Sequence, residues 1–219
     1  TGLAEFARKY PDRFFDVGIA EEHAVTYAAG MARGGLHPVV CIYSTFLQRS
    51  FDQILHDVCL QNLPVVFFVD RAGAVGADGA THQGLFDLSY LGCIPGLHVF
   101  APSDVADFET LYDYARELNA PCAIRYPNGA SGNVFPHLSP RQRLWDGDPV
   151  EGRDNVILAV GPRTYALARK VAAESGKSVA VVNARSVSDL DESLLEKTGG
   201  KRVLTLEENV ERGGFGSSV

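Results

Sequence analysis

The chain of 219 residues lacks the segments that mark membrane and nucleic-acid-binding proteins. No apolar run approaches the roughly 20 residues needed to cross a bilayer, and no signal-peptide pattern opens the chain. Acidic residues outnumber basic ones by 27 to 20, which argues against a general surface for nucleic acid or anionic lipid. A net charge of −7 still permits one local positive pocket for a small anion.

Cysteine is scarce and widely spaced. Cys41, Cys59, Cys93 and Cys122 form no C-x-x-C pair, so a zinc site or a redox motif is not expected. Three of the four stand in apolar runs, where we expect buried free thiols. Free thiols fit a reducing, cytoplasmic location.

Apolar strands alternate with helical segments along the chain. Strands are expected at 14–19, 38–43, 64–69, 97–101, 121–126, 155–160, 178–182 and 202–206, and helices at 21–33, 44–60, 102–118, 165–174 and 190–197, with a short one from 86. This alternation, with strands rich in Val, Ile and Phe, predicts an α/β fold whose parallel sheets are flanked by helices.

A change in composition divides the chain. Residues 131–152 are rich in loop-forming types and lack periodicity. We expect one domain over 1–130, a linker over 131–152, and a second, smaller and truncated α/β domain over 153–219. The chain begins without Met and ends just after a glycine turn, so we expect a piece of a longer polypeptide.

The most informative segment is the glycine-rich loop Arg71-Ala-Gly-Ala-Val-Gly-Ala-Asp-Gly-Ala-Thr-His-Gln-Gly84. It follows the expected strand 64–69 and therefore lies at a strand's carboxyl end, where open α/β sheets bind ligands. It carries an anion binder, a carboxylate and an imidazole: Arg71, Asp78 and His82. No Gly-Lys-[Ser/Thr] follows, so the loop is not a Walker A motif.

Several motifs occur in the order found in one enzyme family. They are Asp16-Val-Gly-Ile-Ala-Glu-Glu-His23, Tyr43-Ser-Thr-Phe-Leu-Gln-Arg49, Asp70-Arg-Ala-Gly73, Gly76-Ala-Asp-Gly79, Thr81-His-Gln-Gly84, Asp87-Leu-Ser-Tyr90, Ala101-Pro-Ser-Asp104, Arg125-Tyr-Pro127 and Glu207-Glu-Asn-Val-Glu-Arg-Gly-Gly-Phe-Gly-Ser217. The chain resembles the 1-deoxy-D-xylulose-5-phosphate synthases, a transketolase-like family that depends on thiamine diphosphate. The likeness is dense through residue 127 and weaker over 131–152.

The resemblance implies a pyrimidine-binding transketolase domain followed by the start of a transketolase C-terminal domain. It implies the decarboxylation of pyruvate and transfer of the two-carbon unit to glyceraldehyde 3-phosphate. The product, 1-deoxy-D-xylulose 5-phosphate, feeds the synthesis of isoprenoids, thiamine and pyridoxal. By the same resemblance the enzyme is a homodimer, and an N-terminal domain absent from this chain binds the diphosphate and Mg2+. No residue here is expected to bind metal.

Three residues are expected at the cofactor. By resemblance, Glu21 hydrogen-bonds the aminopyrimidine nitrogen and favours the tautomer that deprotonates the thiazolium carbon; Phe46 stacks on the ring, and Arg49 stands beside the glutamate. From the residues alone, Glu21 could simply complement a helix dipole, Phe46 could be core, and Arg49 could form a surface ion pair.

A second group is expected at the substrates. Tyr43, Arg71 and Arg125 end three strands, and arginine forks suit phosphate. By resemblance these three residues hold the phosphate of glyceraldehyde 3-phosphate, and His82 orients the 2-oxo acid or relays a proton. Asp78 is expected to bind a substrate hydroxyl or to order the loop. Asn128 stands where the family usually has a second arginine, so it can donate a hydrogen bond but brings no charge.

Two alternatives remain open at this point. Another member of the superfamily, a transketolase or the beta subunit of a 2-oxo-acid dehydrogenase, would share the pyrimidine glutamate. The chain by itself could instead be a non-catalytic binding or dimerisation module, because it lacks the Gly-Asp-Gly diphosphate motif of the family.

Overall fold

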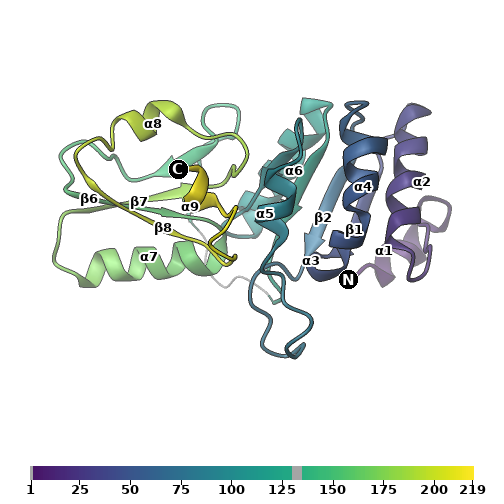
Figure 1. Cartoon of the computed structure of the whole chain (residues 1–219), viewed down its shortest axis with the longest axis horizontal. Helices are drawn as coiled ribbons and strands as arrows, with labels where there is room; N and C mark the ends of the chain where they lie inside the picture. The colour runs from purple at the N-terminus through teal and green to yellow at the C-terminus, as the bar shows by residue number, and fades with distance from the viewer. Residues whose placement is uncertain (1, 130–134) are drawn as a thin grey trace.

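The first of two α/β units contains a sheet of four parallel strands in the order β1-β2-β4-β3 (Figure 1). The computed structural model describes residues 2–129 and 135–219. The strands are β1 (Val39–Tyr43), β2 (Val66–Asp70), β3 (His98–Phe100) and β4 (Cys122–Arg125). Because the strands are parallel, β1, β2 and β4 all deliver their carboxyl ends to one edge of the sheet.

Helices cover both faces of this sheet, as the sequence predicts. The helical elements of this unit are α1 (Ala4–Lys9), η1 (Pro11–Arg13), α2 (Glu21–Arg33), α3 (Ser44–Leu47), η2 (Gln48–Ser50), α4 (Phe51–Gln53), the π-helical η3 (Ile54–Cys59), α5 (Asp87–Gly92) and α6 (Val105–Leu118). Alternate side chains of β2 point to opposite faces of the sheet. Val66 and Phe68 pack with α6, whereas Phe67 and Val69 belong to the core under α2 and α5. Within the described ranges, no helix has the length and apolarity to span a bilayer.

The second unit contains a mixed sheet in the order β5-β7-β6-β8. Its elements are β5 (Trp145–Gly147), β6 (Asn155–Ala159), α7 (Pro162–Glu174), β7 (Val179–Ala184), α8 (Glu192–Glu196), β8 (Arg202–Leu206) and α9 (Phe215–Ser218). Strands β6, β7 and β8 run parallel, and β5 is antiparallel to β7. The glycine turn near the end of the sequence is followed by the short helix α9.

One expectation about the elements is wrong, and one is confirmed with a change of helix type. Residues 14–19 form no strand, because Gly18 adopts φ 71° and its N–H turns back to the Asp16 carboxylate at 2.9 Å. Ile19 is then left 92% exposed. The expected helix 44–60 is helical throughout but is divided into α3, η2, α4 and the π-helical η3.

The segment expected as a linker, 131–152, contains an element of the second sheet. Its first residues, 131–134, lie outside the described part of the chain, but β5 falls inside it and pairs with β7. Trp145 is fully buried and donates its indole N–H to the Ser186 carbonyl at 2.7 Å. The domain boundaries at 130 and 153 stay a prediction.

Backbone hydrogen bonds and a shared apolar core join the two units. The Ala101 N–H donates to the Arg185 carbonyl at 2.8 Å, and the Val187 N–H donates to the Val99 carbonyl at 2.8 Å. One apolar cluster includes residues of both units, Val99 and Val187 among them. The second unit is therefore docked on the β3 side of the first sheet.

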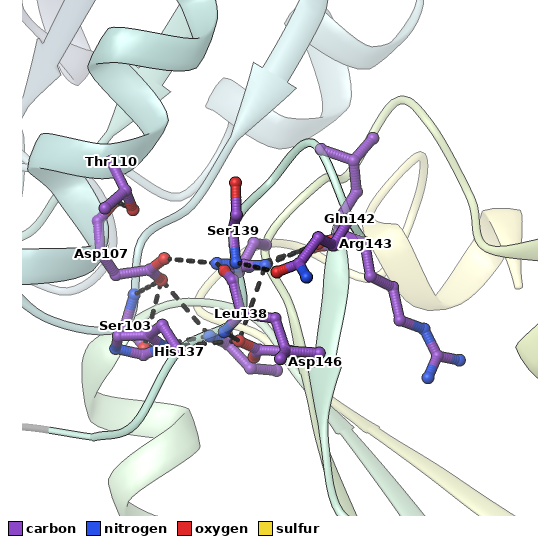
Figure 2. Close-up of polar contacts among 12 residues, drawn as sticks. Ser103, Asp107, Thr110, His137, Leu138, Ser139, Gln142, Arg143 and Asp146 are labelled. Atoms are coloured by element: carbon purple, nitrogen blue, oxygen red, sulfur yellow. Dashed lines mark hydrogen bonds and ion pairs between the residues drawn. The ribbon is translucent and has the colours of Figure 1, made fainter.

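A buried ionic network lies at this junction (Figure 2). Arg185 is fully buried and its Nη1 lies 2.9 Å from the carboxylate of Asp107 on α6. His137 Nε2 lies 2.9 Å from Asp104, and its Nδ1 lies 3.5 Å from Asp146. Burial alone would lower the pKa of His137, but the carboxylates of Asp146 and Asp104 outweigh it and raise that pKa to about 9. The junction therefore holds a protonated imidazole at neutral pH.

We predict that this imidazolium makes stability depend on pH. Its pKa of about 9 in the fold exceeds the ordinary value of 6.5, so its contribution is complete below pH 6.5 and is lost as pH rises through 9. That contribution is on the order of 3 kcal/mol. In urea unfolding, His137→Gln should destabilise the protein at pH 7 and make much less difference at pH 10.

The matched control for this prediction is His56→Gln. His56 pairs with Asp52 on the surface, where both side chains are more than half exposed, so we expect a change of no more than about 0.5 kcal/mol at either pH. A destabilisation by His137→Gln of the same size at both pH values would show that the imidazolium is not the cause.

Candidate active site

A buried carboxylate begins helix α2. Glu21 is the first residue of the helix, which has no side-chain N-cap, and it is 9% exposed. Its Oε1 accepts a hydrogen bond of 3.0 Å from Arg49 Nη1, from the 3-10 segment η2. The carboxylate thus gains both from the positive helix end and from a neighbouring cation. This arrangement holds one oxygen in a fixed direction at the edge of the sheet.

Phe46 connects this carboxylate to the glycine-rich loop. The ring is half-buried and stacks on Tyr43, at the end of β1, with centroids 5.9 Å apart. The Arg49 guanidinium lies 5.1 Å from the same ring, and His82 meets it edge-on at 5.4 Å. Phe46 is therefore part of a polar and aromatic wall rather than of the central core.

The loop after β2 is closed by its own residues. Gly73 and Gly84 exchange backbone hydrogen bonds of 2.7 and 2.9 Å. The side chain of Gln83 reaches across the loop to the N–H and carbonyl of Val75. Gly73 and Gly84 therefore form the base of the loop, and residues 74–83 lie beyond it. Figure 1 shows this loop projecting beyond the sheet edge.

Arg71 occupies a strained backbone position at the start of this loop. Its φ of 57° lies in the left-handed region, which long side chains seldom adopt. Its guanidinium lies 4.2 Å from the Tyr43 ring centroid and forms an ion pair with Asp78. In this conformation the Arg71 guanidinium lies at the end of β1 and binds the tip of the loop through Asp78.

The structure thus brings seven of the expected residues into one connected set: Glu21, Arg49, Phe46, Tyr43, His82, Arg71 and Asp78. They come from α2, the end of β1, the helical segments α3 and η2 that follow it, and the loop after β2. His82 is oriented further by a 2.9 Å contact between its Nδ1 and Thr81 Oγ1. Apolar, cationic and acidic groups therefore face one another across a short stretch of sheet edge.

Arg125 does not join this set through any described contact. It is 4% exposed, and its Nε and Nη2 bind Asp87 at 2.8 and 3.3 Å. Nη2 also donates to the Glu208 carbonyl at 3.2 Å. The three-residue anion pocket expected from Tyr43, Arg71 and Arg125 is therefore not assembled in this structure, because Arg125 is held at the domain junction by Asp87.

Asn128 also lies apart from the main set. Its backbone carbonyl accepts a hydrogen bond of 3.2 Å from Arg163 Nη2, at the start of α7. Arg163 also binds Glu208, at 3.1 Å, and both residues contact the glycine-rich loop.

The sequence analysis predicts no role for three residues of this region: Asp87, Arg163 and Glu208. Asp87 and Glu208 stand inside motifs of the family, Asp87-Leu-Ser-Tyr90 and the segment from 207, which was a signal that could have drawn attention to them. Arg163 carried no such signal. Within residues 2–129 and 135–219, no group of three or more His, Cys, Asp or Glu side chains is placed to hold a metal ion.

Comparisons with known proteins match both units. The family model described as "Transketolase, pyrimidine binding domain" matches residues 1–132, and "Transketolase, C-terminal domain" matches residues 148–219. The chain is 56% identical to a protein named 1-deoxy-D-xylulose-5-phosphate synthase from Carboxydothermus hydrogenoformans, and 51% identical to one of the same name from Clostridium beijerinckii. All of this chain is covered in both cases, but it spans only 36% of each relative's length.

Solved structures agree on the fold. A chain described as "Split gene transketolase, inactive beta4 tetramer" superposes with a TM-score of 0.83 at 30% identity, covering 100% of this chain and 73% of that one. A transketolase mutant from Pichia stipitis superposes with a TM-score of 0.73 at 19% identity, covering 85% of this chain and 29% of that one. The parallel sheet and the mixed sheet thus occur together in other proteins.

We predict that the pair of Arg125 and Asp87 is a structural requirement. Asp87→Ala would leave the Arg125 charge buried without its carboxylate, which should cost about 3–5 kcal/mol in urea unfolding. The control is Asp113→Ala, which removes an exposed partner of Arg116 and should cost less than about 1 kcal/mol. Equal effects of the two substitutions would contradict a structural role for the buried pair.

Proposed function

The chain belongs to the transketolase family, and from that premise we propose that it supplies the pyrimidine-binding half of an active site that uses thiamine diphosphate. The observation that carries the proposal is the Glu21 carboxylate, buried at a sheet edge beside Arg49 and Phe46. The names of the curated relatives support a specific reaction. In it, pyruvate loses carbon dioxide and its two-carbon unit passes to glyceraldehyde 3-phosphate, giving 1-deoxy-D-xylulose 5-phosphate.

The residues present fit an aminopyrimidine ring. Arg49 binds Oε1 of Glu21, and no other side chain or backbone N–H in the described ranges donates to that carboxylate. An acceptor is therefore available for a ring nitrogen, and the half-buried face of Phe46 provides an aromatic surface of matching kind. Thiamine diphosphate, when bound, supplies the carbon nucleophile and the electron sink for decarboxylation.

In this proposal the chain's own side chains exchange one proton with the cofactor ring and hold the ring in position. Glu21 shares a proton with the ring nitrogen, a task that suits a carboxylate sheltered from water. Arg49 fixes the direction of the carboxylate through its 3.0 Å hydrogen bond. Phe46 fixes the plane of the ring. The diphosphate and Mg2+ are assigned to the N-terminal domain, outside this chain.

The substrates are proposed to bind between the ring and the glycine-rich loop. His82 stands on the edge of Phe46, where it can orient the 2-oxo acid or relay a proton. Arg71 and Tyr43 offer a cation and a hydroxyl to the phosphate, and Asp78 offers an acceptor to a substrate hydroxyl. Because Arg71 is paired with Asp78 in the structure, a phosphate must compete with that carboxylate.

Arg125 and Asn128 enter the proposal as a second part of the phosphate site. Arg125 pairs in register with Val69, two positions before Arg71, so both arginines belong to the same sheet edge. The bond to Asp87 holds that guanidinium in place, and it would need to be partly released to bind the phosphate. We further propose a homodimer in the cytoplasm. The location is supported by the four free cysteines.

The first prediction of this proposal concerns turnover. In the full-length enzyme that contains this chain, Glu21→Ala should lower turnover of pyruvate with glyceraldehyde 3-phosphate by about 10²-fold or more, because proton management is lost. The control is Glu22→Ala, which removes the exposed neighbouring acid and should leave turnover near normal. Near-normal turnover in Glu21→Ala would refute the assignment. Activity of the parent with ketose donors but not with pyruvate would favour a transketolase instead.

The second prediction concerns the chain by itself. Titration calorimetry with thiamine diphosphate and Mg2+ should detect weak binding or none, because the diphosphate and the metal supply much of the affinity. Submicromolar binding to this chain would show that it contains a complete cofactor site and that the division of labour proposed here is wrong.

A further inference from the structure

The second unit contacts the glycine-rich loop at the first residue beyond its base. Arg163, in the first turn of α7, donates from Nη1 to the Ala74 carbonyl at 2.7 Å. The Glu208 carboxylate accepts from the Ala74 N–H at 3.3 Å. Arg163 and Glu208 also pair with each other at 3.1 Å. Both polar backbone groups of Ala74 are therefore bound by the same ion pair.

The base of the loop is packed against the same segment of the second unit. Gly73 has φ 82°, and a Cβ placed there would lie 2.8 Å from Glu208 Oε2 and 3.0 Å from Glu208 Cβ. The backbone can therefore approach this side chain only because residue 73 is glycine. On the other side of the base, the Val210 N–H donates to the Leu85 carbonyl at 2.9 Å. Residues 208–210 thus hold both ends of the loop.

The same guanidinium reaches a third segment. Arg163 Nη2 donates to the Asn128 carbonyl at 3.2 Å, in the chain that leaves β4. One side chain of the second unit therefore links the loop after β2 to the segment after β4. These are the two places where the phosphate-binding residues are expected.

We propose that Arg163 and Glu208 are positioning residues that set the glycine-rich loop, and with it Asp78 and His82, against Tyr43 and Phe46. The loop lacks a strand or helix of its own among the described elements. Its position therefore depends on its base, on the contacts of its tip with Arg71 and Phe46, and on these contacts with the second unit. The catalytic meaning of the inference rests on the proposed function. The clamp itself, an ion pair that fixes Ala74, does not.

The inference makes a selective kinetic prediction. Glu21 and Arg49 have no described contact with either clamp residue, so cofactor binding should be little affected. The acceptor phosphate and hydroxyl are assigned to Arg71 and Asp78, whose ion pair depends on the loop. Loosening the clamp should therefore raise the KM for glyceraldehyde 3-phosphate several-fold in the full-length enzyme, and the KM for pyruvate should rise with it because His82 lies on the same loop. The affinity for thiamine diphosphate should stay nearly unchanged.

The test begins with hydrogen–deuterium exchange on this chain, which needs no activity. We compare the parent with Arg163→Met, Arg163→Lys and Glu208→Gln, after confirming equal far-UV circular dichroism. Amides of residues 74–84 should exchange about threefold or more faster in Arg163→Met, because the Ala74 carbonyl loses its donor and Glu208, which accepts from the Ala74 N–H, loses its cationic partner. Arg163→Lys should restore part of the protection, since it keeps the charge and a hydrogen-bond donor but lacks the planar fork of the guanidinium.

The matched control is Arg169→Met, on the same helix. Arg169 is 41% exposed, close to the 44% of Arg163, and it pairs with Asp148 instead of the loop. Unchanged exchange of 74–84 in both Arg163→Met and Glu208→Gln would overturn the clamp, whatever the activity. Faster exchange without any pyruvate-dependent activity in the full-length parent would refute the proposed function and leave the clamp standing. Faster exchange with an unchanged KM for the acceptor would refute the positioning role.

Discussion

The account depends on a carboxylate that the fold keeps almost out of water at the start of a helix. Burying a charge is costly unless partners compensate for the lost hydration, and here the helix end and Arg49 do so for Glu21. Because Arg49 engages one oxygen, the carboxylate cannot turn freely. This buried acid has a fixed direction, an aromatic ring beside it and one oxygen that Arg49 does not engage. That combination is the reason to assign a heterocycle to this edge of the sheet.

The parallel sheet explains why the other groups gather there. Strands β1, β2 and β4 end at the same edge, so the backbones of Tyr43, Arg71 and Arg125 lie at neighbouring strand ends although they are far apart in sequence. The Arg125 side chain is held away from the other two by Asp87. The second unit then adds a constraint that the first sheet lacks. Its residues 208–210 and Arg163 hold the loop that carries Asp78 and His82. Binding chemistry and domain docking are therefore linked through one segment.

The sequence predicts the elements better than the partners of single side chains. Glycine placement and apolar periodicity suffice for α2, for the strands of the first sheet and for β6, β7 and β8, but not for β5, which lies in the segment expected as a linker. The motif order points to the connected set around Phe46. The strand expected at 14–19 failed because Gly18 turns the chain, a local effect that alternating apolar residues conceal. The partner of Arg125 lies 38 residues away in sequence and that of Ala74 lies 89 residues away. Such pairs arise only from the packing of the elements, which no local pattern reports.

The most direct test of the central claim is a crystal structure of the full-length enzyme that contains this chain, with thiamine diphosphate bound. The account predicts that the aminopyrimidine ring lies against Phe46, with its ring nitrogen within hydrogen-bond distance of Glu21 and Arg49 still bound to the same carboxylate. A ring bound elsewhere, with Glu21 contacting only Arg49 or water, would contradict it.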